Sequence, residues 1–431
     1  MNIEKLHSIF LATSGITTDS RNVIQGSVFF ALKGENFDGN KYAKTAIDNG
    51  CSYAIIDDPS LEKDARNILV ENVLQTLQSL AKYHREQIDI PIIAITGSNG
   101  KTTTKELLST IMGLKWKVIS TKGNLNNHIG VPLTLLRIKP ETQFGIVEVG
   151  ANHPGEIKDL CSIIKPTHGL ITNIGRAHIG EFGSFEKVVN AKSELYEWLR
   201  SNQGSIFINA SNRLLNSLIK PSDKTIPYDP NGTGYCGSFN LINSVPFMQV
   251  NWKINNEELD LKTRLFGSYN LENLVAGIAV GIHFGLEPKK IKSAVESYIP
   301  HNNRSQVFNS QNNTLILDAY NANPTSMEAA INEFLKLEEN NKILILGDML
   351  ELGGDTYFEH RRIAELIKDQ PNVKTILVGK NFTEATKGMG IQTFPEINEL
   401  IAYFEADPPY KNTLLLKGSR LIGLERLISH L

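Results

Sequence analysis

Residues 91–106 of the chain read PIIAITGSNGKTTTKE. The apolar run at 92–95 predicts a short buried strand of a parallel sheet, and the residues from Lys101 onward predict a helix. Gly97 and Gly100 bracket the turn between the two. The backbone N–H groups of such a turn and the N-terminus of the following helix attract an anion, and the lysine adds a positive charge. Because the next threonine offers a hydroxyl to Mg²⁺, the stretch predicts a phosphate site on a parallel α/β sheet.

The spacing of the glycines departs from the usual phosphate loop, which has four residues between its two glycines. Only Ser98 and Asn99 intervene in this chain, and Ile95 occupies the place of the first glycine. A Gly-Lys-Thr triplet alone is weak evidence, and an ordinary strand–helix turn is the alternative. Its position between an apolar strand and a helix favours a nucleotide-phosphate site. The predicted contacts are Gly97, Ser98, Asn99, Gly100, Lys101, Thr102 and Thr103.

The composition is that of an ordinary globular protein with a near-neutral charge. The 431 residues exceed the usual size of one core and predict two or three domains. The net charge of −2, without a polybasic run, argues against nucleic acid or a membrane surface as a partner. No apolar run approaches the ~18 residues of a membrane span. A cytoplasmic protein is expected, because the start lacks a signal-peptide core and the three cysteines are scattered, at Cys51, Cys161 and Cys236.

Three modules follow one another along the chain. Residues 1–88 alternate short apolar strands with helical segments and predict a small α/β domain. A helix over 72–87 leads into the second module, residues 89–300, which carries the phosphate loop on a parallel sheet. Residues 301–431 predict a second parallel, Rossmann-like α/β domain, because helical segments separate four apolar strand candidates, at 315–318, 343–346, 375–378 and 413–416.

A polar turn in the first module, Asp19-Ser20-Arg21, allows two interpretations. Ser20 and Arg21 have the chemistry to hold a phosphorylated ligand, because a serine donates a hydrogen bond and an arginine forks onto a phosphate. A solvated turn that caps the next segment is the alternative, and the residues alone favour it.

Two stretches after the phosphate loop add polar groups. Residues 121–130 read TKGNLNNHIG, which either presents amide and backbone donors to a polar ligand or is an asparagine-rich turn.

Glu148 lies inside the apolar strand 145–150. A carboxylate in a buried strand is costly unless it is paired or bound to a metal. In a phosphate-loop protein such an acid is the expected Mg²⁺ ligand, and a buried salt bridge is the alternative.

Four single residues are further candidates. His178 follows the strand 170–174, at the edge where doubly wound sheets bind ligands. A lone histidine is more often structural, but Glu148 and the phosphate loop favour a metal or phosphate role. Lys192 lies in a predicted helix, where the residues alone favour a solvated side chain. Asn270, before an apolar helix at 274–284, either contacts a nucleotide base or caps that helix. Asp318 ends a strand of the third module, so a nucleotide between the domains is plausible.

These stretches together resemble the Mur ligases of peptidoglycan synthesis. The resemblance spans all three modules in order. In the first two modules it rests on TDSR at 18–21, VFFALKG at 28–34, GSNGKTTTKE at 97–106, GNLNNHIG at 123–130, EVGANHPGEI at 148–157 and TNIGRAH at 172–178. In the third module it rests on YNANPTSM at 320–327, LGDMLELG at 346–353 and KGSR at 417–420.

The resemblance implies an activity and a division of labour. ATP would phosphorylate the terminal carboxylate of UDP-N-acetylmuramoyl-tripeptide (UDP-MurNAc-tripeptide), and the amine of D-Ala-D-Ala would attack the acyl phosphate. The first domain would hold the UDP end, the central domain would be a phosphate-loop ATPase domain, and the Rossmann-like third domain would bring the dipeptide. A monomer is expected. Mg²⁺ and Lys101 would offset the negative charge that gathers at the transferred phosphate.

The resemblance also assigns roles to single residues. Thr102, Glu148 and His178 would hold Mg²⁺, and Lys192 would be carbamylated and bind a second Mg²⁺, which reverses the interpretation from the residues alone. Arg304 would enter from the interdomain linker toward the ATP phosphates. For the nucleotide, the resemblance places Asp318 at the ribose and Asn270 near the adenine of ATP. For the UDP-substrate, it places Ser20 and Arg21 at the UDP end, and Thr121, Asn124 and Asn127 near the UDP-sugar and the reacting peptide.

Two departures and two alternatives accompany this interpretation. Tyr269 stands where many family members have histidine, and Asn40-Lys41-Tyr42 replaces a common His-Asp-Phe-like run. The near alternative is another Mur ligase or a folylpolyglutamate-synthase-like amide ligase. The distant alternative is an ATP-binding regulatory module without ligase chemistry. The presence of Lys101, Glu148, His178 and Lys192 argues against the regulatory module.

Overall fold

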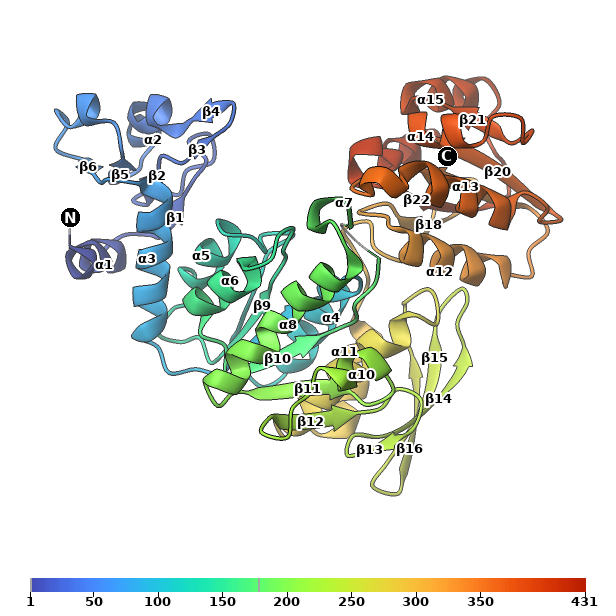
Figure 1. Cartoon of the computed structure of the whole chain (residues 1–431), viewed down its shortest axis with the longest axis horizontal. Helices are drawn as coiled ribbons and strands as arrows, with labels where there is room; N and C mark the ends of the chain where they lie inside the picture. Colours follow the sequence, from blue (N-terminus) through green and yellow to red (C-terminus); the bar gives the residue numbers. More distant parts are fainter. Residues whose placement is uncertain (1, 177–178) are drawn as a thin grey trace.

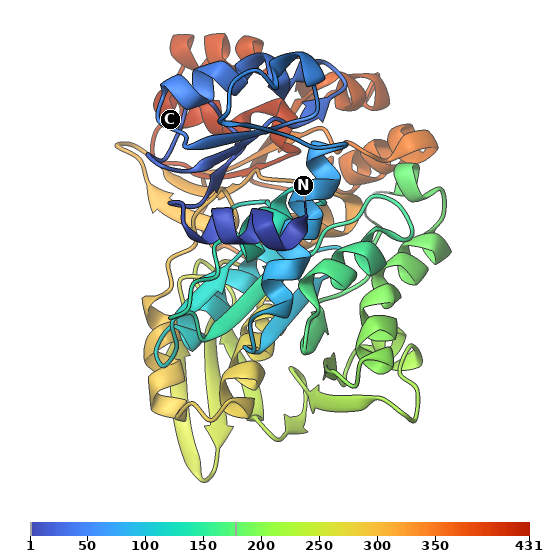
Figure 2. The same ribbon diagram turned by 90° about the vertical axis from the view of Figure 1, so that its left-hand side faces the viewer.

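The computed structural model of the chain describes residues 2–176 and 179–431. Three α/β bodies follow one another, and we call them the first, central and third modules. The first and third modules stand apart above the central one (Figure 1). A view turned by 90° again shows both outer modules above the central module (Figure 2). The predicted α/β fold with three successive domains is confirmed.

The first module is a parallel sheet in the order β1-β2-β5-β6. Its central strand β2 is buried at all three residues, which fits a strand covered on both faces. Its elements are α1 (Ile3–Leu11), β1 (Ile16–Thr17), β2 (Val28–Phe30), the hairpin β3 (Lys33–Gly34) and β4 (Phe37–Asp38), η1 (Gly39–Tyr42), α2 (Ala43–Asp48), β5 (Tyr53–Ile56), η2 (Pro59–Leu61) and β6 (Asn67–Leu69).

Helix α3 (Val73–Glu86) joins the first module to the central one. Asn72 caps its N-terminus, and Leu77 and Leu80 on its inner face are fully buried. Near its C-terminus the buried Arg85 donates to the backbone oxygens of Ile164 and Lys165 in the central module, at 3.0 and 3.2 Å. The helix is therefore tied to the central module.

The central module carries a six-stranded, fully parallel sheet in the order β12-β11-β10-β7-β9-β8. Its strands are β7 (Ile92–Thr96), β8 (Val118–Ser120), β9 (Phe144–Glu148), β10 (His168–Ile171), β11 (Ser205–Asn209) and β12 (Lys224–Tyr228). Its helices are α4 (Lys101–Met112), α5 (Gly130–Leu135), α6 (Glu156–Ile164), α7 (Ile179–Phe182), α8 (Phe185–Ser201), α9 (Arg213–Ser217), α10 (Asn270–His283) and α11 (Pro288–Ser297).

Strand β7 lies inside this sheet because it is apolar on both faces. All five of its residues are buried. Ile92 and Ala94 belong to the core that also contains side chains of α3, α5, α6 and α8, whereas Ile93 and Ile95 belong to the core formed with α4 and α10. Alternation of side chains along a strand sends them to opposite faces, so helices on both sides hold the strand and the loop after it in place.

A small antiparallel sheet in the order β13-β14-β15-β16 completes the central module. Its strands are β13 (Thr233–Gly234), β14 (Gly237–Asn243), β15 (Gln249–Ile254) and β16 (Glu257–Lys262). Trp252 is fully buried in it, and its indole N–H donates to the Cys236 backbone oxygen at 2.7 Å. In Figure 1 this sheet projects away from the outer modules.

The third module is a six-stranded sheet in the order β17-β18-β22-β19-β20-β21, parallel except for β17. Its strands are β17 (Gln306–Asn309), β18 (Thr314–Asp318), β19 (Lys342–Gly347), β20 (Val373–Val378), β21 (Gln392–Phe394) and β22 (Thr413–Lys417). Its helices are α12 (Pro324–Leu335), η3 (Gly353–Asp355), α13 (Thr356–Ile367), α14 (Lys380–Ala385), α15 (Ile397–Ala406), η4 (Arg420–Ile422) and η5 (Leu424–His430). Across residues 2–176 and 179–431, none of the helices has the length and apolar character to span a bilayer.

The central module should lose stability in mild acid because of a buried histidine. Burial, and secondarily His283, lowers the pKa of His168 to about 4. The unfolded chain, with a histidine pKa of about 6.5, binds the proton first as the pH falls. The contribution of neutral His168 is therefore complete above pH 6.5 and disappears toward pH 4, with about 2 kcal/mol lost by pH 5.

The measurement is the free energy of unfolding in urea at pH 7 and at pH 5. We expect His168→Gln to reduce the difference between the two pH values, and we expect the exposed control His153→Gln to leave it unchanged. Equal pH dependence in wild type and His168→Gln would contradict the assignment.

Candidate active site

The phosphate loop, residues 97–100, joins β7 to α4 in the middle of the central sheet. Gly97 and Gly100 have φ angles of +145° and +80°. A Cβ would lie 2.0 Å from Thr172 Oγ1 at the first position and 2.2 Å from Asn273 Oδ1 at the second. Both positions therefore need glycine. Because α4 begins at Lys101, the N–H groups of its first turn have no intrahelical acceptor and are available to an anion.

Strand-end residues after β10 brace this loop. The Asn99 N–H donates to Asn173 Oδ1 at 3.0 Å, and the Thr172 hydroxyl donates to the Asn99 oxygen at 2.6 Å. The Ser98 hydroxyl donates to the Gly175 oxygen at 3.1 Å and accepts from the Gly175 N–H at 2.9 Å. The loop is thus fixed on one side by side chains and is a preformed cradle.

Three cationic side chains converge beside the loop. Lys101 Nζ donates to the Gly97 oxygen at 2.7 Å, and burial lowers the pKa of Lys101, with the Glu148 carboxylate opposing the shift and the positive charge of Arg304 adding to it. Burial, and then Lys101, lowers the pKa of Lys192 to about 7. Within the described residues no hydrogen bond or ion pair reaches the Lys192 ammonium, and Arg304 Nε is buried without a hydrogen-bond partner. Positive charges gathered beside the loop favour the binding of a ligand that carries several negative charges.

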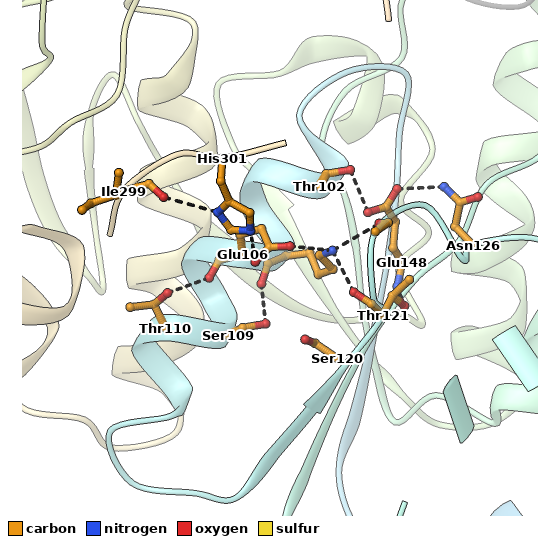
Figure 3. Close-up of polar contacts among 12 residues, drawn as sticks. Thr102, Glu106, Ser109, Thr110, Ser120, Thr121, Asn126, Glu148, Ile299 and His301 are labelled. Atoms are coloured by element: carbon orange, nitrogen blue, oxygen red, sulfur yellow. Dashed lines mark hydrogen bonds and ion pairs between the residues drawn. The ribbon is translucent and has the colours of Figure 1, made fainter. Parts of the chain in front are cut away.

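Glu148, the acid that the sequence places in a buried strand, is the last residue of β9. Its Oε2 accepts from the Thr102 hydroxyl at 2.9 Å, and its Oε1 accepts from the Asn126 amide at 2.8 Å. Figure 3 shows this carboxylate between the two side chains, with Thr121 below it. The side chain is 1% exposed, and no ion pair to it is found in residues 2–176 and 179–431. The alternative of a buried salt bridge is therefore not supported.

The oxygen groups around Glu148 suit Mg²⁺. A carboxylate and a threonine hydroxyl are hard oxygen ligands, and they already lie within hydrogen-bond distance of each other. No group of three or more His, Cys, Asp or Glu side chains gathers as a metal site within residues 2–176 and 179–431. The third predicted ligand, His178, lies outside the described residues.

A cavity of about 1440 Å³ opens from the loop toward both outer modules. It exceeds the about 300–1,000 Å³ of a typical small-molecule site and has room for more than one ligand. Helix α3, which joins the first module to the central one, contributes to its wall. The central module contributes the phosphate loop, Glu148, Lys192 and the asparagine-rich loop, and the third module contributes the ends of β18 and β22 and the start of α12.

The predicted nucleotide residues of the linker region all line this cavity. Asp318 Oδ2 accepts from Lys417 Nζ at 2.6 Å, and Asp318 Oδ1 accepts from the Ser305 N–H at 3.2 Å. Asn270 is the first residue of α10, one turn earlier than the predicted start at 274, and it is 1% exposed. Its amide donates to the Phe266 oxygen at 2.8 Å and accepts from Asn273 at 2.9 Å, so these internal bonds fix its orientation.

The predicted UDP-substrate residues are spread over three places. Asn124 and Asn127 line the cavity. Thr121 is 1% exposed and outside the lining, and its hydroxyl accepts from the Glu148 N–H at 2.9 Å. Ser20 and Arg21 lie in the first module, away from the cavity wall. Arg21 is exposed and paired with Asp19 at 2.9 Å, a fully solvated contact.

The structure adds three residues that sequence reasoning did not assign. Lys105, whose side chain is fully buried, donates to the Thr121 oxygen at 2.8 Å and pairs with Glu106. Asn323 caps α12 and donates to Asn99 Oδ1 at 2.7 Å, which joins the third module to the phosphate loop. Tyr320 lies against Arg304. Their motifs were visible in the sequence, but these contacts join different elements, and Asn323 lies 224 residues from Asn99 along the chain.

The site combines a phosphate loop on a parallel sheet with a cleft between two α/β modules that positively charged side chains line. These features define a class of enzyme that uses a nucleotide and has several modules for its substrates. Comparison with protein families gives the particular group. Residues 12–85 match the Mur ligase family, catalytic domain, residues 95–281 match the Mur ligase middle domain, and residues 303–420 match the Mur ligase, glutamate ligase domain. The chain belongs to the Mur ligase family.

Individual relatives agree with this assignment along almost the whole chain. The UDP-N-acetylmuramoyl-tripeptide--D-alanyl-D-alanine ligase of Bacillus subtilis is 32% identical over 97% of this chain and 93% of its own length. The enzyme of the same name from Escherichia coli is 30% identical over 98% and 95%. The crystal structure of MurF from Acinetobacter baumannii superposes with a TM-score of 0.84 at 31% identity, covering 96% of this chain and 92% of that one.

Proposed function

We propose that the chain is the ATP-dependent ligase that adds D-Ala-D-Ala to UDP-MurNAc-tripeptide in peptidoglycan synthesis. The observation that carries the proposal is the cleft at the phosphate loop, which the central module, the third module and helix α3 line together. Lys101, Lys192 and Arg304 line the cleft beside that loop, and the Glu148 carboxylate lies near Lys101. Relatives named for this reaction match nearly the full length of the chain.

The cleft suits a reaction through an acyl phosphate. A tripeptide carboxylate oxygen attacks the γ-phosphorus of ATP, and the bond to the β-γ bridging oxygen breaks, which releases ADP. The uncharged amine of D-Ala-D-Ala then attacks the acyl carbon, phosphate leaves, and the amine loses a proton. Lys101 and the first turn of α4 offset the charge of the transferred group, and Arg304 adds a third source of positive charge.

The metal ligands of this proposal are Thr102, Glu148 and His178. When bound, Mg²⁺ would neutralise the phosphate oxygens and align them for in-line transfer. Asn126 holds the Glu148 carboxylate at 2.8 Å, and the Thr121 hydroxyl accepts from its backbone N–H. These two contacts orient the acid toward Thr102.

We further propose that Lys192 is carbamylated. Only an uncharged amine adds CO₂, and burial favours the uncharged form of Lys192, which is 2% exposed. Its ammonium lies 5.9 Å from the centroid of the Phe182 ring and close enough to Lys101 for the two positive charges to oppose each other. The product is an anion in place of a cation, which would remove that repulsion and supply an oxygen ligand for a second Mg²⁺.

The modules divide the substrates in the proposal. Residues 1–88 hold the UDP end with Ser20 and Arg21, residues 89–300 hold ATP, and residues 301–431 bring D-Ala-D-Ala. Asn124 and Asn127 would contact the UDP-sugar and the peptide, Asn270 the adenine and Asp318 the ribose. The protein would act in the cytoplasm as a monomer, because one chain supplies the whole cleft and its three cysteines are free and buried.

Phosphate release tests the proposal directly. Release is measured with ATP, Mg²⁺, UDP-MurNAc-tripeptide and D-Ala-D-Ala, and then with each component omitted in turn. We expect full release only with all four. Release that does not depend on the dipeptide would overturn the assignment, and release with a folate and glutamate instead would identify a different amide ligase of this fold.

A further inference from the structure

The linker between the central and third modules is fixed to the third module around Arg304. Asn302, Asn303 and Ser305 have φ angles of +61°, +57° and +46°. Asparagine tolerates this left-handed region, whereas it is uncommon for a serine, so the conformation at Ser305 indicates that contacts hold the backbone there. The Asn303 oxygen accepts from the Tyr320 N–H at 3.2 Å. On the other side of Arg304, the Ser305 N–H donates to Asp318 Oδ1 at 3.2 Å. Both partners lie at the end of β18.

The side chain of Arg304 is held by the same strand end. Its guanidinium carbon lies 3.8 Å from the centroid of the Tyr320 ring, well inside the distance of a cation–π contact. Both side chains line the cleft. The charge of Arg304 contributes to the environment of Lys101, so the guanidinium reaches the neighbourhood of the phosphate loop. No other residue holds Arg304 Nε within the described part of the chain.

We propose that Tyr320 is a positioning residue for Arg304, which its ring holds on the side of the cleft that faces the phosphate loop. The proposal rests on the proposed function for the role of Arg304 at the phosphates. The third module also contacts the loop directly, from Asn323 on α12 to Asn99 Oδ1, at 2.7 Å.

The ring of Tyr320, rather than its hydroxyl, is the part that matters. No hydrogen bond to that hydroxyl is found in residues 2–176 and 179–431. Phenylalanine would keep the aromatic face at the same place, whereas leucine would fill similar space without the π electrons that attract a cation. A packing role and a positioning role therefore give different results for these two substitutions.

A double-mutant cycle tests the proposal. The variants are Tyr320→Phe, Tyr320→Leu, Arg304→Ala and the double variant Tyr320→Leu/Arg304→Ala, each measured for kcat and for the KM of ATP. We expect Tyr320→Phe to stay within about 2-fold of wild type and Tyr320→Leu to lower kcat by about 10-fold. In the Arg304→Ala background, Tyr320→Leu should cost much less than in wild type, because the group that it positions is gone. Any small remaining effect reports Arg420, whose guanidinium carbon lies 5.5 Å from the centroid of the same ring.

The opposite results would overturn the proposal. These are an equal loss from Tyr320→Phe and Tyr320→Leu, or the same 10-fold loss from Tyr320→Leu with and without Arg304. Direct titration of ATP into wild type and the same four variants separates this failure from failure of the proposed function. If wild type shows no dipeptide-dependent turnover but the cycle in ATP affinity is coupled, the ligase assignment fails and the positioning role stands.

Discussion

Lys192→Ala should abolish dipeptide-dependent phosphate release, with a loss of about 10²–10³-fold or more. The lysine is 2% exposed on α8 and borders the cleft. If it is carbamylated, the substitution removes an anion that binds metal at the transferred phosphate, and added bicarbonate has no amine to react with. Bicarbonate should therefore not restore activity. Short carboxylic acids, which resemble the missing carbamate, should restore part of it.

The matched control is Lys187→Ala, an exposed lysine on the same helix, which should retain activity. Labelled ¹³CO₂ gives a readout that does not depend on turnover. A carbamate carbonyl resonance is expected in wild type and in Lys187→Ala, and it should be missing in Lys192→Ala. Near-normal activity of Lys192→Ala would remove the carbamate proposal.

Glu148→Gln should lower the rate by about 10²-fold and raise the Mg²⁺ concentration needed for half-maximal phosphate release. The change keeps the shape of a side chain that is 1% exposed and removes only its charge. A neutral amide is a weaker ligand for Mg²⁺ than a carboxylate. The Thr102 hydroxyl can rotate to accept from the new amide, so the fold should persist.

Asp159→Asn is the control for the second experiment, because it also removes one negative charge from the cavity wall but lies on an exposed turn of α6. We expect its Mg²⁺ dependence to match that of wild type. If Glu148→Gln requires no more Mg²⁺ than wild type, Glu148 is a structural acid held by Thr102 and Asn126, and the metal assignment fails.

The phosphate loop is the part of the site that local sequence describes best. The apolar run at 92–95 predicts a buried strand, and β7 is buried at all five residues. Gly97 and Gly100 were expected in a tight turn, and both have positive φ. These features depend on backbone conformation and on side chains within a few residues, so sequence spacing contains them.

Lys192 and Thr121 show where local reasoning stops. From the residues alone Lys192 is a solvated helix lysine, and only resemblance to a family suggested otherwise, yet the side chain is buried. Thr121 belongs to a polar loop whose residues alone predict either donors to a ligand or a turn, and its hydroxyl accepts from the Glu148 N–H on the neighbouring strand. The burial of a side chain depends on segments from elsewhere in the chain that pack over it. The hydrophobic periodicity of its own segment does not indicate those contacts.

The sequence by itself determined the order of three α/β modules, the phosphate loop at 97–104 and the identity of the acid at the end of β9. Tertiary structure decided which cations reach that loop and what holds them. Asn99 and Asn323 are joined at 2.7 Å although they lie in different modules, and the guanidinium carbon of Arg304 lies 3.8 Å from the centroid of the Tyr320 ring. The physical reason is the distance along the chain between the residues that interact. Strand, turn and helix follow from neighbours in sequence, whereas a cleft between modules is made of contacts that exist only after the modules have docked.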